Sequence, residues 1–136
     1  MTSQEKIKYL ERYKNIDRRV QTKCDEKSVW MARATKITPT MSSMPKGGQQ
    51  DNKIESAIEK IIEIEKDIDT EIDELIKIKS EVKAAISTVS DNRYRELLER
   101  RYIKGQTWEQ IAVDMNYDYR WLLRMHGKAL YILDTP

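Results

Sequence analysis

Apolar residues recur at alternating intervals of three and four residues through most of residues 9–89. This heptad spacing lines them up on one side of an α-helix, which must then pack against another helix. The first stripe comprises Tyr9, Tyr13, Ile16, Val20, Lys23, Lys27, Trp30 and Ala34, with the two lysines as exceptions. The second stripe comprises Ile54, Ile58, Ile61, Glu65, Ile68, Ile72, Leu75, Lys79, Val82, Ile86 and Val89, with Glu65 and Lys79 as its two polar exceptions.

The segment between the two stripes, residues 38–50, reads TPTMSSMPKGGQQ and is rich in residues that break helices. We therefore expect a first long helix over residues 1–37, a linker over 38–50 and a second long helix over 51–89, with Asp51 as its N-cap. The linker is long enough for a turn within one chain, which we favour. Pairing between helices of two chains fits the same pattern.

Charge is segregated between these two helices. Residues 1–50 hold eleven Lys and Arg against five Asp and Glu, whereas residues 51–90 hold six against eleven. A basic element followed by an acidic one predicts that the two face each other. Each exposed ion pair contributes only about 0–1 kcal/mol, so apolar burial must hold the seam. The extra isoleucines at 62, 64, 76 and 78 widen the second stripe, which is our candidate for a homodimer interface. The hairpin is either a solvated spacer or a docking arm.

Residues 90–133 carry the signals of three short helices. Ser90 can cap a helix over about residues 91–104, and Gly105 can end it. Its apolar side is Tyr94, Leu97, Leu98 and Tyr102. Thr107 and Gln110 form a capping box for the next helix. That helix has Trp108, Ile111, Ala112 and Met115 on its inner face.

The link to the last helix is very short. Asn116 tolerates a left-handed backbone, and Asp118 can cap a helix over residues 118–133. A support helix followed by two helices joined by a tight turn is the helix-turn-helix layout.

The helix over 118–133 divides into two faces. Its predicted buried side comprises Leu122, Met125, Ala129, Ile132 and Leu133. Its predicted DNA-binding side comprises Tyr119, Arg120, Leu123, Arg124, Gly127, Lys128 and Tyr131. Arg120, Arg124 and Lys128 recur every four residues and form a cationic ridge suited to guanine edges and phosphates. Thr107, Arg100 and Arg101 are the expected phosphate contacts, with Arg93 and Arg95 as further candidates. The alternative is a solvated basic face.

The stretch LLERRYIKGQTWEQIAVDMNYDYRWLLRMHGKALYIL resembles region 4 of sigma-70 type sigma factors and, less specifically, the helix-turn-helix ends of response regulators. The resemblance covers residues 90–133. With the long charged helices ahead of it, the chain is similar to small phage and prophage proteins grouped with late-gene transcription regulators. Asn116, Asp118 and Trp121 depart from the usual residues of the pattern, so the resemblance implies the fold and not the base sequence that is read.

The resemblance implies a DNA-binding transcriptional regulator of phage or prophage type in the bacterial host cytoplasm, with double-stranded DNA as its partner. No segment resembles the sigma region that melts the −10 element, which favours an accessory regulator over a complete sigma factor. A runner-up is an adaptor that docks on RNA polymerase or another protein through the hairpin.

The residues themselves argue against several other classes of protein. One Cys and one His provide no zinc-ligand set, and no phosphate loop or catalytic constellation is present, so we expect no cofactor, no metal site and no enzyme activity. Apolar runs are too short for a membrane span, and a single Cys24 fits a reducing compartment. The expected fold is all-α: a long antiparallel, coiled-coil-like hairpin followed by a three-helix helix-turn-helix domain.

Overall fold

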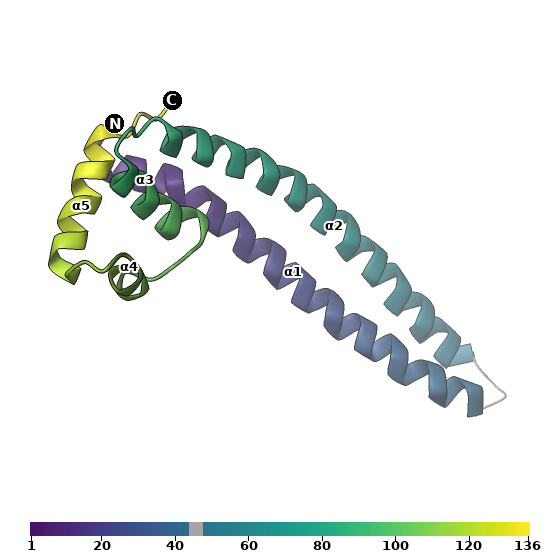
Figure 1. The fold of residues 1–136 in the computed structure, drawn as a ribbon. Coiled ribbons are helices and arrows are strands. Elements are labelled where there is room, and N and C mark those ends of the chain that lie inside the picture. The colour runs from purple at the N-terminus through teal and green to yellow at the C-terminus, as the bar shows by residue number, and fades with distance from the viewer. Residues whose placement is uncertain (44–47) are drawn as a thin grey trace. The chain divides into compact units, whose positions relative to one another are not determined.

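The computed structural model describes residues 1–43 and 48–136, and every regular element in these ranges is helical (Figure 1). The elements are α1 (Ser3–Ser43), α2 (Gly48–Ser87), α3 (Asn92–Leu98), the π-helical turn η1 (Glu99–Ile103), α4 (Trp108–Met115) and α5 (Tyr119–Ile132). The prediction of an all-α hairpin followed by short helices is confirmed. Residues 18–73 form one compact unit, and residues 1–17 and 74–136 together form another.

The long helices extend further than the sequence predicted. Helix α1 continues past residue 37 to Ser43, and α2 begins at Gly48. Pro39 removes one backbone donor, and that single loss does not end this helix. Asp51 lies inside α2 and is not its N-cap. The remainder of the predicted linker, residues 44–47, lies outside the described residues.

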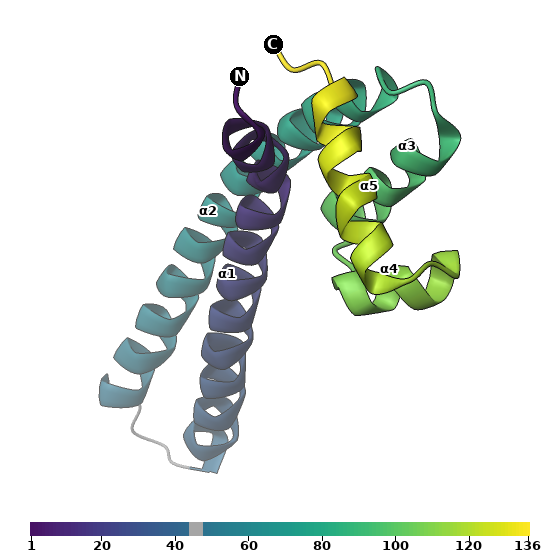
Figure 2. The same cartoon turned by 90° about the vertical axis from the view of Figure 1, so that its left-hand side faces the viewer.

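Within the unit of residues 18–73, α1 and α2 run antiparallel side by side, as Figures 1 and 2 show. Three ion pairs join them: Arg19 to Glu71 at 3.3 Å, Lys23 to Asp67 at 3.5 Å and Lys27 to Glu65 at 3.1 Å. The first residue number rises as the second falls, as an antiparallel pair requires. The hairpin therefore closes within one chain, with the basic helix facing the acidic one. The pairs are partly exposed, so they select the register more than they stabilise it.

The seam on α2 differs from the predicted stripe by one residue at alternate positions. The less exposed residues at these positions are Ile54, Ala57, Ile61, Ile64, Ile68, Glu71, Leu75, Ile78, Val82 and Ala85, followed by Val89 beyond the end of the helix. Ile86 of the predicted stripe is buried as well. Ile64 and Ile78 are buried, whereas Glu65, one of the two polar exceptions of the predicted stripe, is exposed. Burial of the adjacent isoleucines removes apolar surface from water, which explains why the helix turns this way. The displaced Ile58 and Ile72 face solvent.

The second unit has a continuous apolar core. Figure 2 shows α5 beside α3 and α4, and α5 contacts both. Its most deeply buried side chains are Leu10, Val82, Ile86, Val89, Leu97, Leu98, Ile111, Leu122, Met125 and Leu133. Each buried leucine contributes about 1.5–3 kcal/mol by leaving water. Leu10 lies outside the predicted α1 stripe and is buried because α1 is covered on more than one side in this unit.

Helix α3 is capped one residue later than predicted. Asp91, rather than Ser90, accepts the backbone N–H of Arg93 at 2.9 Å. The Arg93 side chain also bonds this carboxylate, which lowers the pKa of Asp91. The helix then widens into η1, where the Lys104 N–H donates to the Glu99 carbonyl at 3.0 Å. Gly105 follows with a φ of +72°, which confirms it as the helix stop.

The C-terminal end of α5 is held by a side chain of α1. The Lys6 ammonium donates to the carbonyl oxygens of Leu130 and Leu133, both at 2.8 Å. Carbonyls in the last turn of a helix have no partner inside the helix and carry a partial negative charge. Lys6 therefore acts as a C-terminal cap for α5 although it lies more than a hundred residues away in the sequence.

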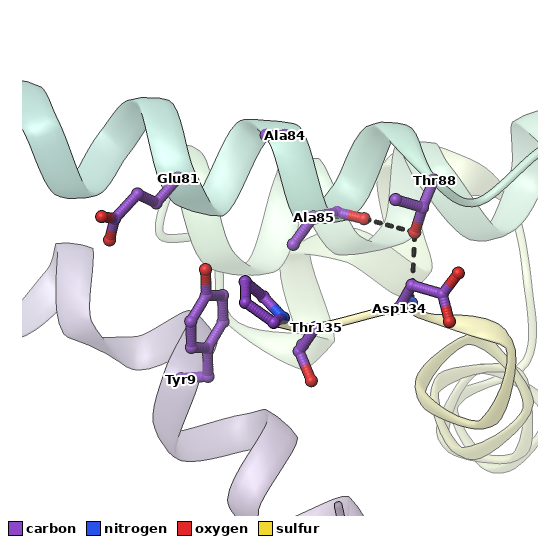
Figure 3. A pocket seen from close by; sticks show the side chains of 8 residues that line it. Tyr9, Glu81, Ala84, Ala85, Thr88, Asp134 and Thr135 are labelled. Carbon is purple, nitrogen blue, oxygen red and sulfur yellow. Dashed lines mark hydrogen bonds between the residues drawn. The ribbon is translucent and has the colours of Figure 1, made fainter.

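The segment after α5 returns to the end of α2. The Asp134 N–H donates to the Thr88 hydroxyl oxygen at 3.2 Å, and that hydroxyl donates to the Ala85 carbonyl at 2.6 Å (Figure 3). Tyr9 and Glu81 face the same hollow, whose volume is about 440 Å³. These bonds fix the direction in which the chain leaves α5.

Candidate nucleic-acid interface

The turn between α4 and α5 is defined by its own short-range contacts. Thr107 Oγ1 accepts the Gln110 N–H at 3.2 Å, and Gln110 Oε1 accepts the Thr107 N–H at 2.9 Å. Asn116 ends α4 in the left-handed region, with φ 58° and ψ 45°. Asp118 then caps α5 by accepting the Arg120 N–H at 3.2 Å. The predicted capping box, left-handed residue and N-cap are all confirmed.

The buried side of α5 is close to the prediction. Leu122, Met125, Ala129 and Leu133 are buried, but Ile132 is 45% exposed and Leu130 takes its place. The buried side therefore turns toward Leu130 in the last turn, where Lys6 also bonds the backbone.

The opposite side of α5 faces solvent along its length. Tyr119, Arg120, Leu123, Arg124, Gly127, Lys128 and Tyr131 are all exposed, as predicted from the helical period. The Arg120 and Arg124 side chains have no ion pair among the described residues. We call Arg120, Arg124 and Lys128 the α5 ridge. Lys128 forms no ion pair among the described residues either, so all three cations are available to an external anion.

Gly127 leaves space on the α5 ridge that the fold does not use. A Cβ built there meets nothing within 4 Å, so packing inside the protein does not require glycine. Glycine in a helix costs about 1 kcal/mol relative to alanine. Because glycine has no side chain, this position would let an external ligand come close to the helix, which is a reason for glycine that offsets its cost.

Sequence reasoning missed two aromatic contributions to this surface. Tyr94 of α3 joins Arg124, Lys128 and Tyr131 around a shallow hollow of about 650 Å³, with Gly127 and Ile132 completing its lining. The exposed Trp121 ring lies 5.2 Å from the Lys128 ammonium. The i, i+7 spacing of Trp121 and Lys128 places both residues on one face and could have suggested this contact.

The three expected phosphate contacts already have partners within the domain. Arg100 pairs with Asp114 at 3.2 Å and Glu96 at 3.6 Å, and its side chain is only 20% exposed. Arg101 donates to the Gln106 carbonyl at 3.1 Å and covers the Trp108 ring at 4.7 Å. The Thr107 hydroxyl accepts the capping-box bond and keeps its own proton to donate. Their phosphate role stays a prediction, and for Arg100 it would require breaking an internal network.

His126 lies at the junction of η1, α4 and α5. Its Nε2 is 2.7 Å from the Tyr102 hydroxyl oxygen, and the Trp108 ring packs edge-on at 4.5 Å. Burial, together with the nearby Arg101 charge, lowers the pKa of His126 to about 4. Burial also raises the pKa of Tyr102. The predicted structural role for His126 agrees with this packing.

The low pKa of His126 predicts a pH-dependent stability. The folded protein keeps this imidazole neutral, while the unfolded chain binds a proton below pH 6.5, so stability decreases as the pH falls from about 6.5 toward 4. We expect the free energy of unfolding in urea to be about 2 kcal/mol lower at pH 5 than at pH 7. His126 is the only histidine, and most carboxylates titrate below this range. The His126→Gln protein should lose this dependence, and an equal slope in both proteins would contradict the assignment.

Comparison with known protein families identifies one that matches this chain. Residues 36–134 match the family described as Protein of unknown function (DUF1492). The chain belongs to the DUF1492 family. The match includes all of α2, α3, η1, α4 and α5, so the α5 ridge lies in the family-defining part. No curated protein and no solved structure matches the chain.

Other classes of site receive little support. In the described ranges, no three metal-ligating side chains come together and no helix has the length and apolar character to cross a bilayer. Cys24 is a free, half-buried thiol beside the hairpin seam. The α5 ridge is therefore the candidate site that we develop.

Proposed function

We propose that this protein is a sequence-specific DNA-binding transcriptional regulator of phage or prophage type, and that it inserts α5 into the major groove. One observation carries the proposal: a capped helix, a left-handed Asn116 and a second capped helix present Arg120, Arg124 and Lys128 outward. In the helix-turn-helix class, the second helix of such a pair contacts base edges with its N-terminal half.

The chemistry of the α5 ridge suits this role. Arg120 and Arg124 lie in the first half of α5, and an arginine can form two hydrogen bonds with guanine O6 and N7. Each such pair provides about 1–3 kcal/mol of discrimination against a wrong base. Leu123 offers an apolar contact to a thymine methyl group, and Lys128 lies further along to hold a phosphate.

Selection from a random duplex library tests the proposal directly. We expect one sequence class to be enriched, and binding to the enriched duplex to weaken with salt. With about three phosphates neutralised, the slope of log K against log salt concentration should be close to −3. Equal affinity for the enriched duplex and a scrambled duplex of the same composition would refute sequence-specific binding.

A further inference from the structure

The outer side of α2 carries a second heptad stripe whose isoleucines the hairpin does not bury. We call Ile58, Ile62, Glu65, Asp69 and Ile72 the outer α2 stripe, and their intervals are four, three, four and three residues. All five residues are exposed; Ile58 and Ile62 are each exposed to 47% and Ile72 to 36%. This is the spacing with which one helix receives another.

The hairpin gives no reason for these isoleucines. Its seam on the same stretch of α2 is formed by Ala57, Ile61, Ile64, Ile68 and Glu71, which face a different side of the helix. Exposed apolar residues that recur in register on a charged helix indicate a binding surface rather than scattered surface residues.

The charge of the outer α2 stripe selects its partner. Glu65 and Asp69 lie between the isoleucines; Glu55, Glu59 and Asp73 flank them, together with the single exposed cation Lys66 among these carboxylates. Glu65 reaches Lys27 at 3.1 Å, but its side chain stays half exposed. Asp69 has no ion pair among the described residues. A partner helix would therefore place apolar side chains against a surface whose acidic centre Lys27 neutralises only at Glu65.

A second copy of this chain fits the stripe poorly. In an antiparallel pair of α2 helices that places Ile58 opposite Ile72 of the other copy, Glu65 would lie opposite its own counterpart and Ile62 would lie close to Asp69. A parallel pair would place Glu65 opposite its own counterpart. Like charges across a helix seam are destabilising, so either arrangement opposes the apolar gain.

We propose that the outer α2 stripe binds a basic amphipathic helix of a partner protein. Apolar side chains of that helix, three and four residues apart, pack on Ile58, Ile62 and Ile72. Lysine or arginine side chains at its centre pair with Glu65 and Asp69. This site is separate from the α5 ridge, and it does not depend on DNA binding.

Two synthetic helical peptides, each three heptads long, test the proposal. Both carry leucine at the heptad core positions, and they differ in having lysine or glutamate at the others. In fluorescence anisotropy with the full-length protein, the lysine peptide should bind and the glutamate peptide should not. Equal binding of both peptides, or binding of neither, would overturn the proposal.

Variants locate the site. The Ile62→Ser/Ile72→Ser protein should bind the lysine peptide at least tenfold more weakly, because two apolar contacts are lost without a change of charge. Asp69→Lys should weaken it by a similar factor through repulsion. The matched control, Val113→Ser on α4, removes an exposed β-branched side chain elsewhere and should leave the affinity unchanged. Unchanged affinity in the double variant would also overturn the proposal.

Analytical ultracentrifugation of the protein without peptide tests the remaining alternative, that a second copy of this chain occupies the outer α2 stripe. We expect a monomer. A dimer that dissociates in the Ile62→Ser/Ile72→Ser protein would make a second copy the occupant and would refute the basic partner.

Discussion

Charge reversal at Arg120 and Arg124 is expected to abolish binding to the duplex enriched from the random library. Each arginine lost removes about 1–3 kcal/mol of base contact, and each glutamate introduced is repelled by the neighbouring phosphates. The Arg120→Glu/Arg124→Glu protein should therefore lose at least about a thousandfold in affinity. Both side chains are exposed and form no ion pair with any residue that the structure describes, so the fold should be unaffected. Anisotropy titrations at one fixed salt concentration measure the loss.

A control variant with the same change of net charge distinguishes direct contact with DNA from long-range electrostatic attraction to it. Lys77 and Lys83 are exposed on α2, and Lys77→Glu/Lys83→Glu changes the net charge by the same amount. This control should lose less than about tenfold, since those lysines affect DNA only through the long-range field. Comparable losses in the two double variants would mean that the α5 ridge has no special contact with DNA. Retained binding in the arginine variant would refute the proposed function itself.

Substitution at neighbouring positions of α2 should have very different effects on stability. Ile64 is buried in the hairpin seam, so Ile64→Lys places an unpaired ammonium in an apolar contact and should cost about 3–5 kcal/mol. Ile62 is exposed, so Ile62→Lys should change stability by no more than about 0.5 kcal/mol. Urea unfolding followed by helical circular dichroism measures both.

This pair of variants tests the register of the seam as well as its stability. The residue type and the introduced charge are identical, and only the side of the helix differs. If Ile62→Lys were the more damaging change, the seam would lie on the outer α2 stripe, and the proposed docking surface would be part of the hairpin.

The helix-turn-helix could be predicted from sequence because its defining contacts are local. Thr107 bonds Gln110 three residues away, Asn116 adopts a left-handed backbone by itself, and Asp118 bonds a residue two positions later. The outward α5 ridge follows from the helical period once the caps fix where the helix starts. These features need no knowledge of the rest of the fold.

Features set by tertiary packing could not be predicted in the same way. Isoleucines occupy both faces of α2, so periodicity alone could not choose between Ile64 and the adjacent stripe position, Glu65. The sequence predicts a phosphate contact for Arg100 because it does not show that Asp114 is its partner. Asp114 comes close to Arg100 only when α4 packs on η1. The Lys6 cap on α5 joins residues at opposite ends of the sequence, and no local pattern signals it.

That cap has a consequence for how the protein is made. Lys6 is synthesised 124 and 127 residues before Leu130 and Leu133, whose carbonyls it binds. Contacts of such long sequence separation slow folding, since a large loop must close before they form. On the ribosome, residues 18–73 can form their helical pair as soon as they emerge. The Lys6 cap can form only after Leu133 has been synthesised. A fragment that starts after residue 17 would leave those two carbonyls without Lys6, so the unit that contains α5 is not a contiguous segment of the sequence that can be separated.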